Sequence, residues 1–432
     1  MAVIKISAAG DSFVTQPVQR NEKWKELRDF FCGHDARFTN LEIVLHDFEV
    51  YPAPLSGGSW ASARPEILNE FKDIGFNLLG CANNHSFDWN IGGILKTIEH
   101  VRRAGIVHAG IGHNLAEAAQ PCYINTPQGR VAMISVTSTC PVWGMASQQR
   151  PDVLGRPGAN VLRYEAVHKV PPEQLEELKK ITEKTEVNAD RLLNEKEGFA
   201  KPLQGGFYVG NIRFEADSYS HTVTRMNQDD ADRIVKSIKE ARRQADLVMV
   251  SIHGHERKGL DKTLPPDFIK DFAHLCIDSG ASLFIGHGPH IWRGVEVYKN
   301  RPIFYSLGNF IFQSDSTERQ PTEFYDLYNL GPGNTVSDGL EKRSMNETRG
   351  LAADPRVYES AVISITAENG EIMSADIHPI TLGFHKNRPS KGLPELASGE
   401  AAEEVLHHIQ DLSEPYGTVI DIKNGIGTVR LH

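Results

Sequence analysis

The sequence predicts an α/β protein with a layered core, and three observations support this class. Short apolar runs of strand character alternate along the chain with stretches whose apolar residues recur at helical spacing. The composition, with 40% hydrophobic and 24% charged residues, is typical of a globular protein. Polar segments rich in Asp, Glu, Asn and His lie within the predicted strands or just after them, where α/β sheets usually carry ligand sites.

The first part of the chain predicts strands that lead into polar residues. The opening strand ends at Gly10-Asp11, the second apolar run contains Glu42, and Asn83-Asn84-His85 follows the third. In chain order, the expected elements are strands over 3–9 and 37–44, a helix over 65–72, a strand over 76–81, a helix over 91–104 and a strand over 130–136.

The later part repeats this alternation and adds histidine-rich segments. His253-Gly254-His255-Glu256 ends one strand, and Gly286-His287-Gly288-Pro289-His290 follows another. Any one polar segment is what a surface turn would show, but five of them at strand ends, far apart in the chain, predict a shared site. The elements expected here are helices over 231–243, 265–279 and 401–412, strands over 246–251, 282–285, 361–366 and 372–380, and two short strands near Val419 and Val429.

Two stretches interrupt the alternation. Residues 141–226 contain a charged helix over 172–186 and irregular Gly- and Pro-containing segments, and residues 313–358 are polar and turn-rich. We interpret both as insertions in a domain of residues 1–385, placed as lids over the site, with disorder as the alternative for the second. Residues 386–432 are expected to add a helix and short strands that pack on this core.

Charge and cysteine usage exclude several classes of protein. The 46 basic and 56 acidic residues give a net charge of −10, which argues against a nucleic-acid partner but allows a local basic patch for an anionic substrate. Five cysteines without a CxxC pair argue against a disulfide framework or a thiolate zinc site. No apolar stretch approaches the roughly 18 residues of a membrane span, and no signal peptide opens the sequence, so we expect a cytoplasmic location.

The side chains in the polar segments match the needs of a hydrolytic metal centre. Such a centre uses a bridging carboxylate, neutral nitrogen or amide-oxygen ligands and open positions for water. Carboxylate and imidazole ligands together suit Mn, Fe or Zn better than Ca or Mg. We therefore predict one or two divalent ions, with ligands drawn from Asp11, Glu42, Asn84, His253, His287 and His290.

Six motifs occur in a fixed order: Gly10-Asp11, Asn40-Leu41-Glu42, Asn83-Asn84-His85 with Asp88, His253, Gly286-His287-Gly288-Pro289-His290, and Tyr305-Ser306-Leu307-Gly308-Asn309-Phe310. This pattern resembles the CapA/PgsA family of poly-γ-glutamate capsule synthesis proteins, part of the calcineurin-like metallophosphoesterase superfamily. The resemblance covers about residues 3 to 385 apart from the two insertions. It implies a calcineurin-like metallophosphatase fold, a four-layer αββα sandwich with a dinuclear metal site at one edge.

The resemblance also implies a role for each motif residue. Asp11 looks like a ligand of the first metal, Glu42 like the bridging carboxylate and Asn84 like the metal-binding amide. The remaining ligands match His253, His287 and His290. Phe13 stands where the superfamily often has a histidine, which implies a ligand-poor first site.

Two further residues resemble the catalytic pair of the superfamily. His85 resembles a histidine that protonates the leaving group, and Asp88 is placed to orient His85 and fix its tautomer. Other candidates follow the ligands in sequence and are assigned to substrate binding: Arg257, Lys258, Arg293, His255 and Asn309. Solvated surface charge is the alternative for the three basic residues, and His255 is either an extra metal ligand or part of the pocket wall.

The predicted function is hydrolysis by a metal-bound hydroxide, with His85 as general acid. The substrate is expected to be a small or oligomeric anionic molecule that carries a phosphoester or an amide or ester bond. The family's link to the capsule favours γ-glutamyl or peptide-like amides, whereas the superfamily favours phosphoesters. The alternative is a non-catalytic accessory protein of poly-γ-glutamate capsule synthesis.

Overall fold

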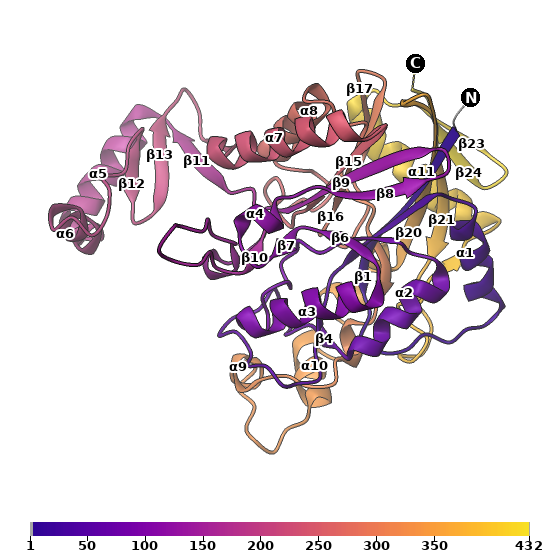
Figure 1. The fold of residues 1–432 in the computed structure, drawn as a ribbon. Helices are drawn as coiled ribbons and strands as arrows, with labels where there is room; N and C mark the ends of the chain where they lie inside the picture. Colours follow the sequence, from indigo (N-terminus) through magenta and orange to yellow (C-terminus); the bar gives the residue numbers. More distant parts are fainter. Residues whose placement is uncertain (1–2, 432) are drawn as a thin grey trace.

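Strand β1 lies inside a ten-stranded sheet of the computed structural model, which describes residues 3–431 (Figure 1). The path of this sheet runs β23-β24-β21-β20-β1-β2-β5-β6, with β19 also pairing with β1 and β22 with β21. Its strands are β1 (Val3–Phe13), β2 (Ala36–Leu41), β5 (Leu78–Gly80), β6 (Val107–Ala109), β19 (Asn309–Phe312), β20 (Glu359–Glu368), β21 (Glu371–Thr381), β22 (Glu395–Leu396), β23 (Ile420–Lys423) and β24 (Ile426–Val429).

A second sheet of six strands has the order β17-β18-β16-β15-β9-β8. Its inner face shares one buried cluster with the first sheet, in which Ile6 and Phe38 meet Met249 and Ile285. The two sheets therefore pack face to face. The strands of this sheet are β8 (Cys122–Thr126), β9 (Gly129–Thr137), β15 (Leu247–His253), β16 (Leu283–His287), β17 (Val295–Tyr298) and β18 (Arg301–Phe304).

Helices cover the outer faces of both sheets. Ile238 and Phe272 of α7 and α8 share a buried cluster with Val250 of β15, and apolar residues of α1, α2 and α3 join a separate cluster with β1, β2 and β19. The resulting order is helices, sheet, sheet, helices (Figure 1). The helices of these two layers are α1 (Glu22–Cys32), α2 (Leu68–Ile74), α3 (Asn90–Ala104), α7 (Gln228–Gln244) and α8 (Asp267–Asp278).

The predicted α/β class and the predicted alternation are confirmed. Helix α3, for example, buries Ile94, Ile98 and Val101 at helical spacing, and it is followed by Gly105, whose φ of 73° suits a left-handed cap. The helix predicted over 401–412 is α11 (Glu400–Ser413), and the two predicted C-terminal strands are β23 and β24, which extend the first sheet through β21. Helix α1, with buried Trp24, Leu27 and Phe31, is an element that the sequence analysis did not identify.

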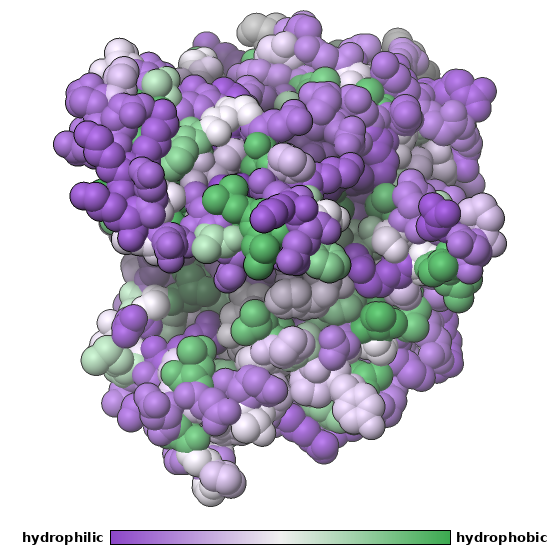
Figure 2. All heavy atoms as spheres, turned by 90° about the vertical axis from the view of Figure 1, so that its left-hand side faces the viewer, coloured by the Kyte–Doolittle hydropathy of each residue, from purple (hydrophilic) through white to green (hydrophobic). Residues whose placement is uncertain are grey.

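Residues 164–226 form a lobe of their own, which projects on the left of Figure 1. A four-stranded sheet with the order β12-β13-β11-β14 carries α5 on one side. Figure 2 faces this side of the molecule and shows a largely hydrophilic lobe above a hollow. The elements are β11 (Tyr164–Val170), α5 (Pro172–Thr185), α6 (Ala189–Lys196), β12 (Phe207–Val209), β13 (Ile212–Ala216) and β14 (His221–Met226).

The polar stretch over 313–358 contains two short α-helices, α9 (Thr322–Leu327) and α10 (Val336–Ser344). Phe324 and Leu340 from these helices pack against Trp60 and Trp89, which explains why two tryptophans near the polar motifs are buried. The remaining elements are the paired strands β3 (Val44–Leu45) and β4 (Ser62–Ala63), the paired strands β7 (Ile111–Gly112) and β10 (Gly158–Ala159), and α4 (Leu115–Ala118). Among the described helices, none combines the length and apolar character that crossing a bilayer requires.

Candidate metal centre

Parallel strand pairing brings the polar motifs to one edge of the sandwich. Strand β1 runs parallel to β2 and β19, with Asp11 opposite Asn40 and Asn309, and β15 runs parallel to β16, with His253 opposite His287. Because parallel strands end at the same edge of their sheet, the side chains that follow them gather there. Most of the predicted site residues are buried, among them Asp11, Glu42, His85, His253, His287 and His290.

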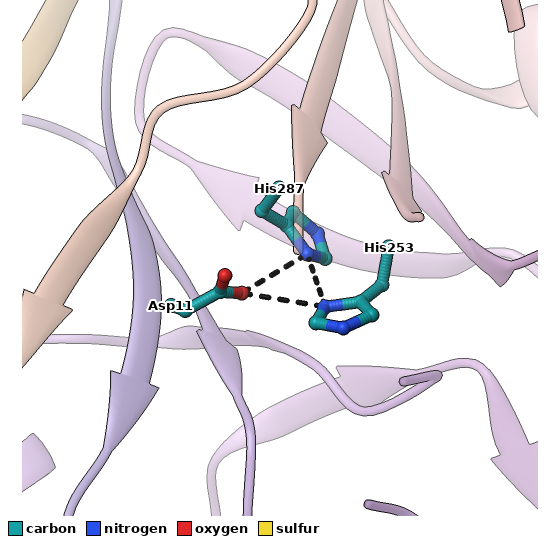
Figure 3. Close-up of side chains that lie close together, drawn as sticks. All are labelled: Asp11, His253 and His287. Carbon is teal, nitrogen blue, oxygen red and sulfur yellow. Dashed lines mark hydrogen bonds and ion pairs between the residues drawn. The ribbon is translucent and has the colours of Figure 1, made fainter. Parts of the chain in front are cut away.

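Asp11, His253 and His287 form the first cluster (Figure 3). Asp11 Oδ1 lies 3.3 Å from Nδ1 of each histidine, and the two Nδ1 atoms are 3.0 Å apart. The three side chains point at a common centre from two different sheets. This is the arrangement that a cation bound by one carboxylate and two imidazoles requires.

Neighbouring groups fix the first cluster in place. Asn40 Nδ2 donates to Asp11 Oδ1 at 2.8 Å, the backbone N–H of Gly288 donates to Asp11 Oδ2 at 2.8 Å, and Ser251 Oγ lies 2.7 Å from Nε2 of His287. Asn40 and Ser251 are supporting residues to which the sequence analysis assigned no role. Asn40 stands in the Asn-Leu-Glu motif, whereas nothing in the sequence marks Ser251.

Gly288 is required by this geometry. Its φ is 120°, and a Cβ there would lie 2.8 Å from the backbone nitrogen of Gly254. Only glycine permits this conformation at so close an approach. The tight turn after β16 therefore explains the Gly-His-Gly-Pro-His spacing, which presents both His287 and His290 to the site.

Glu42, His255 and His290 form a second cluster beside the first. Glu42 Oε1 lies 3.8 Å from His290 Nε2 and 3.6 Å from His253 Nε2, and the latter nitrogen is 3.1 Å from His255 Nε2. The imidazole of His253 thus faces both clusters. His255 lies with the candidate ligands, which favours the first of the two roles left open for it.

Unpartnered oxygens mark the second cluster. Glu42 Oε1, Glu42 Oε2 and Asn84 Oδ1 are buried and have no hydrogen-bond partner among residues 3–431. A buried carboxylate without a partner is strongly unfavourable, so such groups normally bind a cation or a donor. Because the Glu42 carboxylate and the imidazoles of His255 and His290 converge here, the residues present fit a bound cation.

Burial sets the protonation of these groups. Burial raises the pKa of Glu42 well above its usual range, and the charges of Asp11 and Asp88 raise it further. Burial also acts to raise the pKa of Asp11, but His253 and His287 outweigh it and leave that pKa well below its usual range. Burial lowers the pKa of His253 and of His290 to about 4, so both imidazoles are neutral near pH 7 and have a lone pair for a metal.

His85 and Asp88 lie beside the second cluster. His85 Nδ1 is 2.6 Å from Asp88 Oδ2, and His85 Nε2 is 4.0 Å from Glu42 Oε1. Asp88 also accepts backbone N–H groups of Ala61 at 2.8 Å and Gly57 at 3.1 Å. With Nδ1–H donated to Asp88, the Nε2 atom of His85 faces the centre.

Phe13 occupies the position at which the family resemblance leads us to expect a histidine. Its ring packs edge-on against His85, with ring centroids 5.4 Å apart, and it also contacts the ring of Phe312. Phe13 therefore supports the placement of His85 by packing and supplies no ligand. The first cluster has Asp11, His253 and His287 as its titratable candidates.

The three basic residues assigned to substrate binding do not join either cluster of candidate ligands. Arg293 is 1% exposed and donates to the carbonyls of Glu256 and Lys262, which holds the loop after β15. Arg257 is exposed, and Lys258 is exposed and 3.7 Å from Asp267. The exposure of Arg257 and Lys258 agrees with the alternative that they are solvated surface charges. The contacts of Arg293 indicate a structural role for this residue.

Asn309 is fully buried next to a candidate ligand. Its Oδ1 lies 2.9 Å from His290 Nδ1, and its Nδ2 donates to the carbonyl of Val357 at 2.9 Å. The residue is therefore placed to orient His290, with the Nε2 atom of that histidine facing Glu42. His290 itself has a φ of 62°, a left-handed conformation that is uncommon outside glycine.

Comparison with known proteins identifies a matching family and several relatives of this chain. The profile of the family described as bacterial capsule synthesis protein PGA_cap matches residues 5–314. The uncharacterized protein y4sH of Sinorhizobium fredii is 32% identical over 98% of this chain and 92% of its own length. Capsule biosynthesis protein CapA of Bacillus anthracis is 24% identical over 64% of this chain and 50% of its own, and PGA biosynthesis protein CapA of Bacillus subtilis is 22% identical over 77% and 70%.

Proposed function

This chain belongs to the bacterial capsule synthesis protein family, and from that premise we propose that it is a metal-dependent hydrolase with a calcineurin-like metallophosphatase fold. One observation carries the proposal. Glu42 Oε1 is buried without a hydrogen-bond partner in the described chain, yet it lies 3.6 to 4.0 Å from imidazole nitrogens of His253, His290 and His85. The layering of helices around two packed sheets supports the fold assignment.

We assign the ligands by cluster. Asp11, His253 and His287 would hold one ion, and the second would be held by Glu42, His290, His255 and the free amide oxygen of Asn84. A divalent cation in such a site acts as a Lewis acid toward a phosphoryl or carbonyl oxygen and lowers the pKa of a coordinated water toward neutrality. Mn, Fe or Zn suits this mixed set of oxygen and nitrogen atoms.

The protein's own part in the reaction centres on His85. Asp88 accepts the Nδ1–H of His85, which leaves Nε2 to carry the proton that is delivered to the leaving oxygen or nitrogen. The charge of Asp88 stabilises the protonated ring before delivery. Because the backbone N–H groups of Ala61 and Gly57 hold Asp88, the ring keeps its orientation throughout the reaction.

The proposed substrate carries a phosphoester or an amide or ester bond, and amides of γ-glutamyl type are the first class to test. The relatives from Bacillus anthracis and Bacillus subtilis are named for capsule and PGA biosynthesis, which favours an anionic, polyglutamate-related substrate. The same names describe biosynthesis and state no reaction. They therefore also favour a second candidate, a non-catalytic accessory role in capsule synthesis.

The test is to measure bound metal and turnover in the same preparation. The purified protein is analysed for Mn, Fe and Zn and then assayed against phosphoesters, γ-glutamyl amides and lactams. Metal near stoichiometry together with turnover of one class supports the hydrolase. Full metal occupancy without turnover on any class, together with co-purification of a polymer synthase, would support the accessory role instead.

A further inference from the structure

A cleft of about 470 Å³ opens beside the metal centre. Asn84, Asp88, Trp143, Tyr164 and Glu256 are among the residues that line it. The cleft lies at the base of the projecting lobe, because Tyr164 is the first residue of β11. A substrate bound at the metals would therefore extend into this space.

The cleft contains a carboxylate that is held in one orientation. Ser138 Oγ donates to Glu256 Oε2 at 2.6 Å, and Thr139 Oγ1 donates to Glu256 Oε1 at 2.9 Å. Thr139 Oγ1 also accepts the backbone N–H of His255 at 2.9 Å, so the carboxylate is tied to the loop that carries this candidate ligand. Each carboxylate oxygen can accept more than one hydrogen bond, so Glu256 can still bind a donor from a ligand.

The charge of Glu256 is not matched by a cation in the cleft. Among the described residues that line it, none is a lysine or an arginine. Arg293 does not line the cleft, and it donates to the backbone carbonyl of Glu256. Burial lowers the pKa of Arg293 to about 10, and the charge of Glu256 acts through space in the opposite direction. Asp88, the other acid in the cleft, already accepts three groups, namely His85, Ala61 and Gly57.

Two aromatic rings complete the walls of the cleft. Trp143 and Tyr164 are 38% and 40% exposed, although side chains of this kind usually bury more of their surface. The Tyr164 ring stacks on Phe268 with centroids 4.4 Å apart, which fixes its position. Aromatic faces next to a carboxylate are a favourable environment for an organic cation.

We propose that this cleft binds a protonated amine of the substrate and that Glu256 is the residue that selects it. The inference rests on the proposed hydrolase function and names its substrate class: a molecule with an ammonium group on one side of the scissile bond. The anionic or polarised part would lie at the metals, and the ammonium group would lie between the carboxylate and the aromatic walls. A γ-glutamyl amide with a free α-amine and an aminoalkyl phosphoester both fit this description.

Two matched pairs of probes test the proposal on the metal-loaded protein. γ-Glutamyl-p-nitroanilide and glutaryl-p-nitroanilide differ only in the α-amine, and 2-aminoethyl phosphate and ethyl phosphate differ only in the terminal amine. Binding is measured by calorimetry and turnover by kcat/KM. We expect the wild type to prefer the amine-bearing member of the pair that it accepts by roughly tenfold or more, as a charge-assisted hydrogen bond would give.

The variant Glu256→Gln keeps the shape of the side chain and removes its charge, so it should abolish this preference. Glu177→Gln, an exposed position on α5, is the matched control and should retain it. Equal affinity of the wild type for both members of each pair would overturn the proposal without any variant. A preference that survives in Glu256→Gln would do the same.

The outcomes separate this inference from the hydrolase proposal. Amine-dependent binding that requires Glu256, without hydrolysis of any probe, would reject the hydrolase and keep the assignment of the cleft. Hydrolysis with no amine preference would keep the hydrolase and reject the cleft assignment. If the metal-loaded protein neither binds nor hydrolyses any of the probes, the result counts against both proposals.

Discussion

His85 Nδ1 lies 2.6 Å from Asp88 Oδ2, and both side chains are almost completely buried. Burial raises the pKa of Asp88, while the interaction with His85 acts in the opposite direction. The short contact fixes the ring of His85, with its Nε2 atom 4.0 Å from Glu42 Oε1. A histidine in this setting is suited to deliver a proton and to regain one.

Replacing His85 should separate catalysis from metal binding. We expect His85→Ala to retain its metal and to lose activity by roughly 10² to 10⁴-fold, because the general acid is removed and the candidate ligands remain. The exposed His407→Ala serves as control and should behave as wild type. Loss of metal from His85→Ala would place this histidine among the ligands instead.

Replacing Asp11 or His287 should empty the first metal position. Asp11→Ala removes the carboxylate that faces both histidines, and His287→Ala removes one of the two imidazoles. Both variants should contain less metal by elemental analysis, whereas the exposed Asp152→Ala should not. Unchanged metal content in both site variants would refute the assignment of this cluster.

Metal binding should release a proton from Glu42. Since the folded-state pKa of Glu42 is raised above 4.5, its contribution to the stability of the metal-free protein is present below about pH 4.5 and is lost as the pH rises through the raised value. Above that value the buried carboxylate is charged without a partner. We expect Glu42→Gln to raise the melting temperature of the metal-free protein at pH values above the raised pKa of Glu42 and to weaken metal binding.

The released proton can be counted directly. Calorimetric titration with metal in buffers of different ionisation enthalpy reports the number of protons released on binding. Below the raised pKa of Glu42, the wild type should release more protons on binding metal than Glu42→Gln, by up to one per protein. Equal proton release in the two proteins would show that Glu42 is already ionised before metal binds.

The turn that carries His287 and His290 should tolerate no side chain at Gly288. A Cβ at this position meets the backbone of Gly254, and the φ of 120° disfavours any other residue. We expect Gly288→Ala to lose on the order of 2 kcal/mol of stability or more and to bind metal weakly. Gly198 also has a positive φ, but a Cβ there would meet open space. Thermal melts of Gly198→Ala and Gly288→Ala therefore separate the cost of the backbone clash from the cost of a left-handed conformation.

Asn309 should act on the second metal through His290. Removal of its amide oxygen frees the ring of His290, and loss of such an orienting contact typically weakens metal affinity by roughly 10 to 100-fold. Asn309→Ala should therefore lose affinity for one of two ions while the other is retained. A change in KM with both metal affinities unchanged would instead support the substrate-binding role expected from the sequence.

The sequence predicted the strands and the motif residues well because both depend on local patterns. Apolar runs define β1, β15 and β16, and polar residues at their ends mark the edge where ligands gather. The structure brings Asp11, His253 and His287 together as the motif pattern predicted. Their roles as metal ligands remain predictions for the experiments above.

The remaining features depend on contacts that no local pattern reveals. Arg293 follows a candidate ligand in sequence, but its guanidinium is buried against backbone carbonyls of a distant loop. Ser251 is an ordinary strand residue until β16 places His287 beside it. Glu256 acquires its orientation from Ser138 and Thr139, more than a hundred positions earlier in the chain.

The ring of His253 connects the two clusters through its opposite nitrogens, with Nδ1 near Asp11 and Nε2 near Glu42 and His255. A neutral imidazole has a single N–H hydrogen, so when one nitrogen donates its lone pair to an ion, the other must carry that hydrogen. When an ion is bound to Nδ1, Nε2 therefore carries the hydrogen and can donate it toward Glu42. Loading of one position thereby alters what the neighbouring position offers, and the two occupancies cannot be statistically independent.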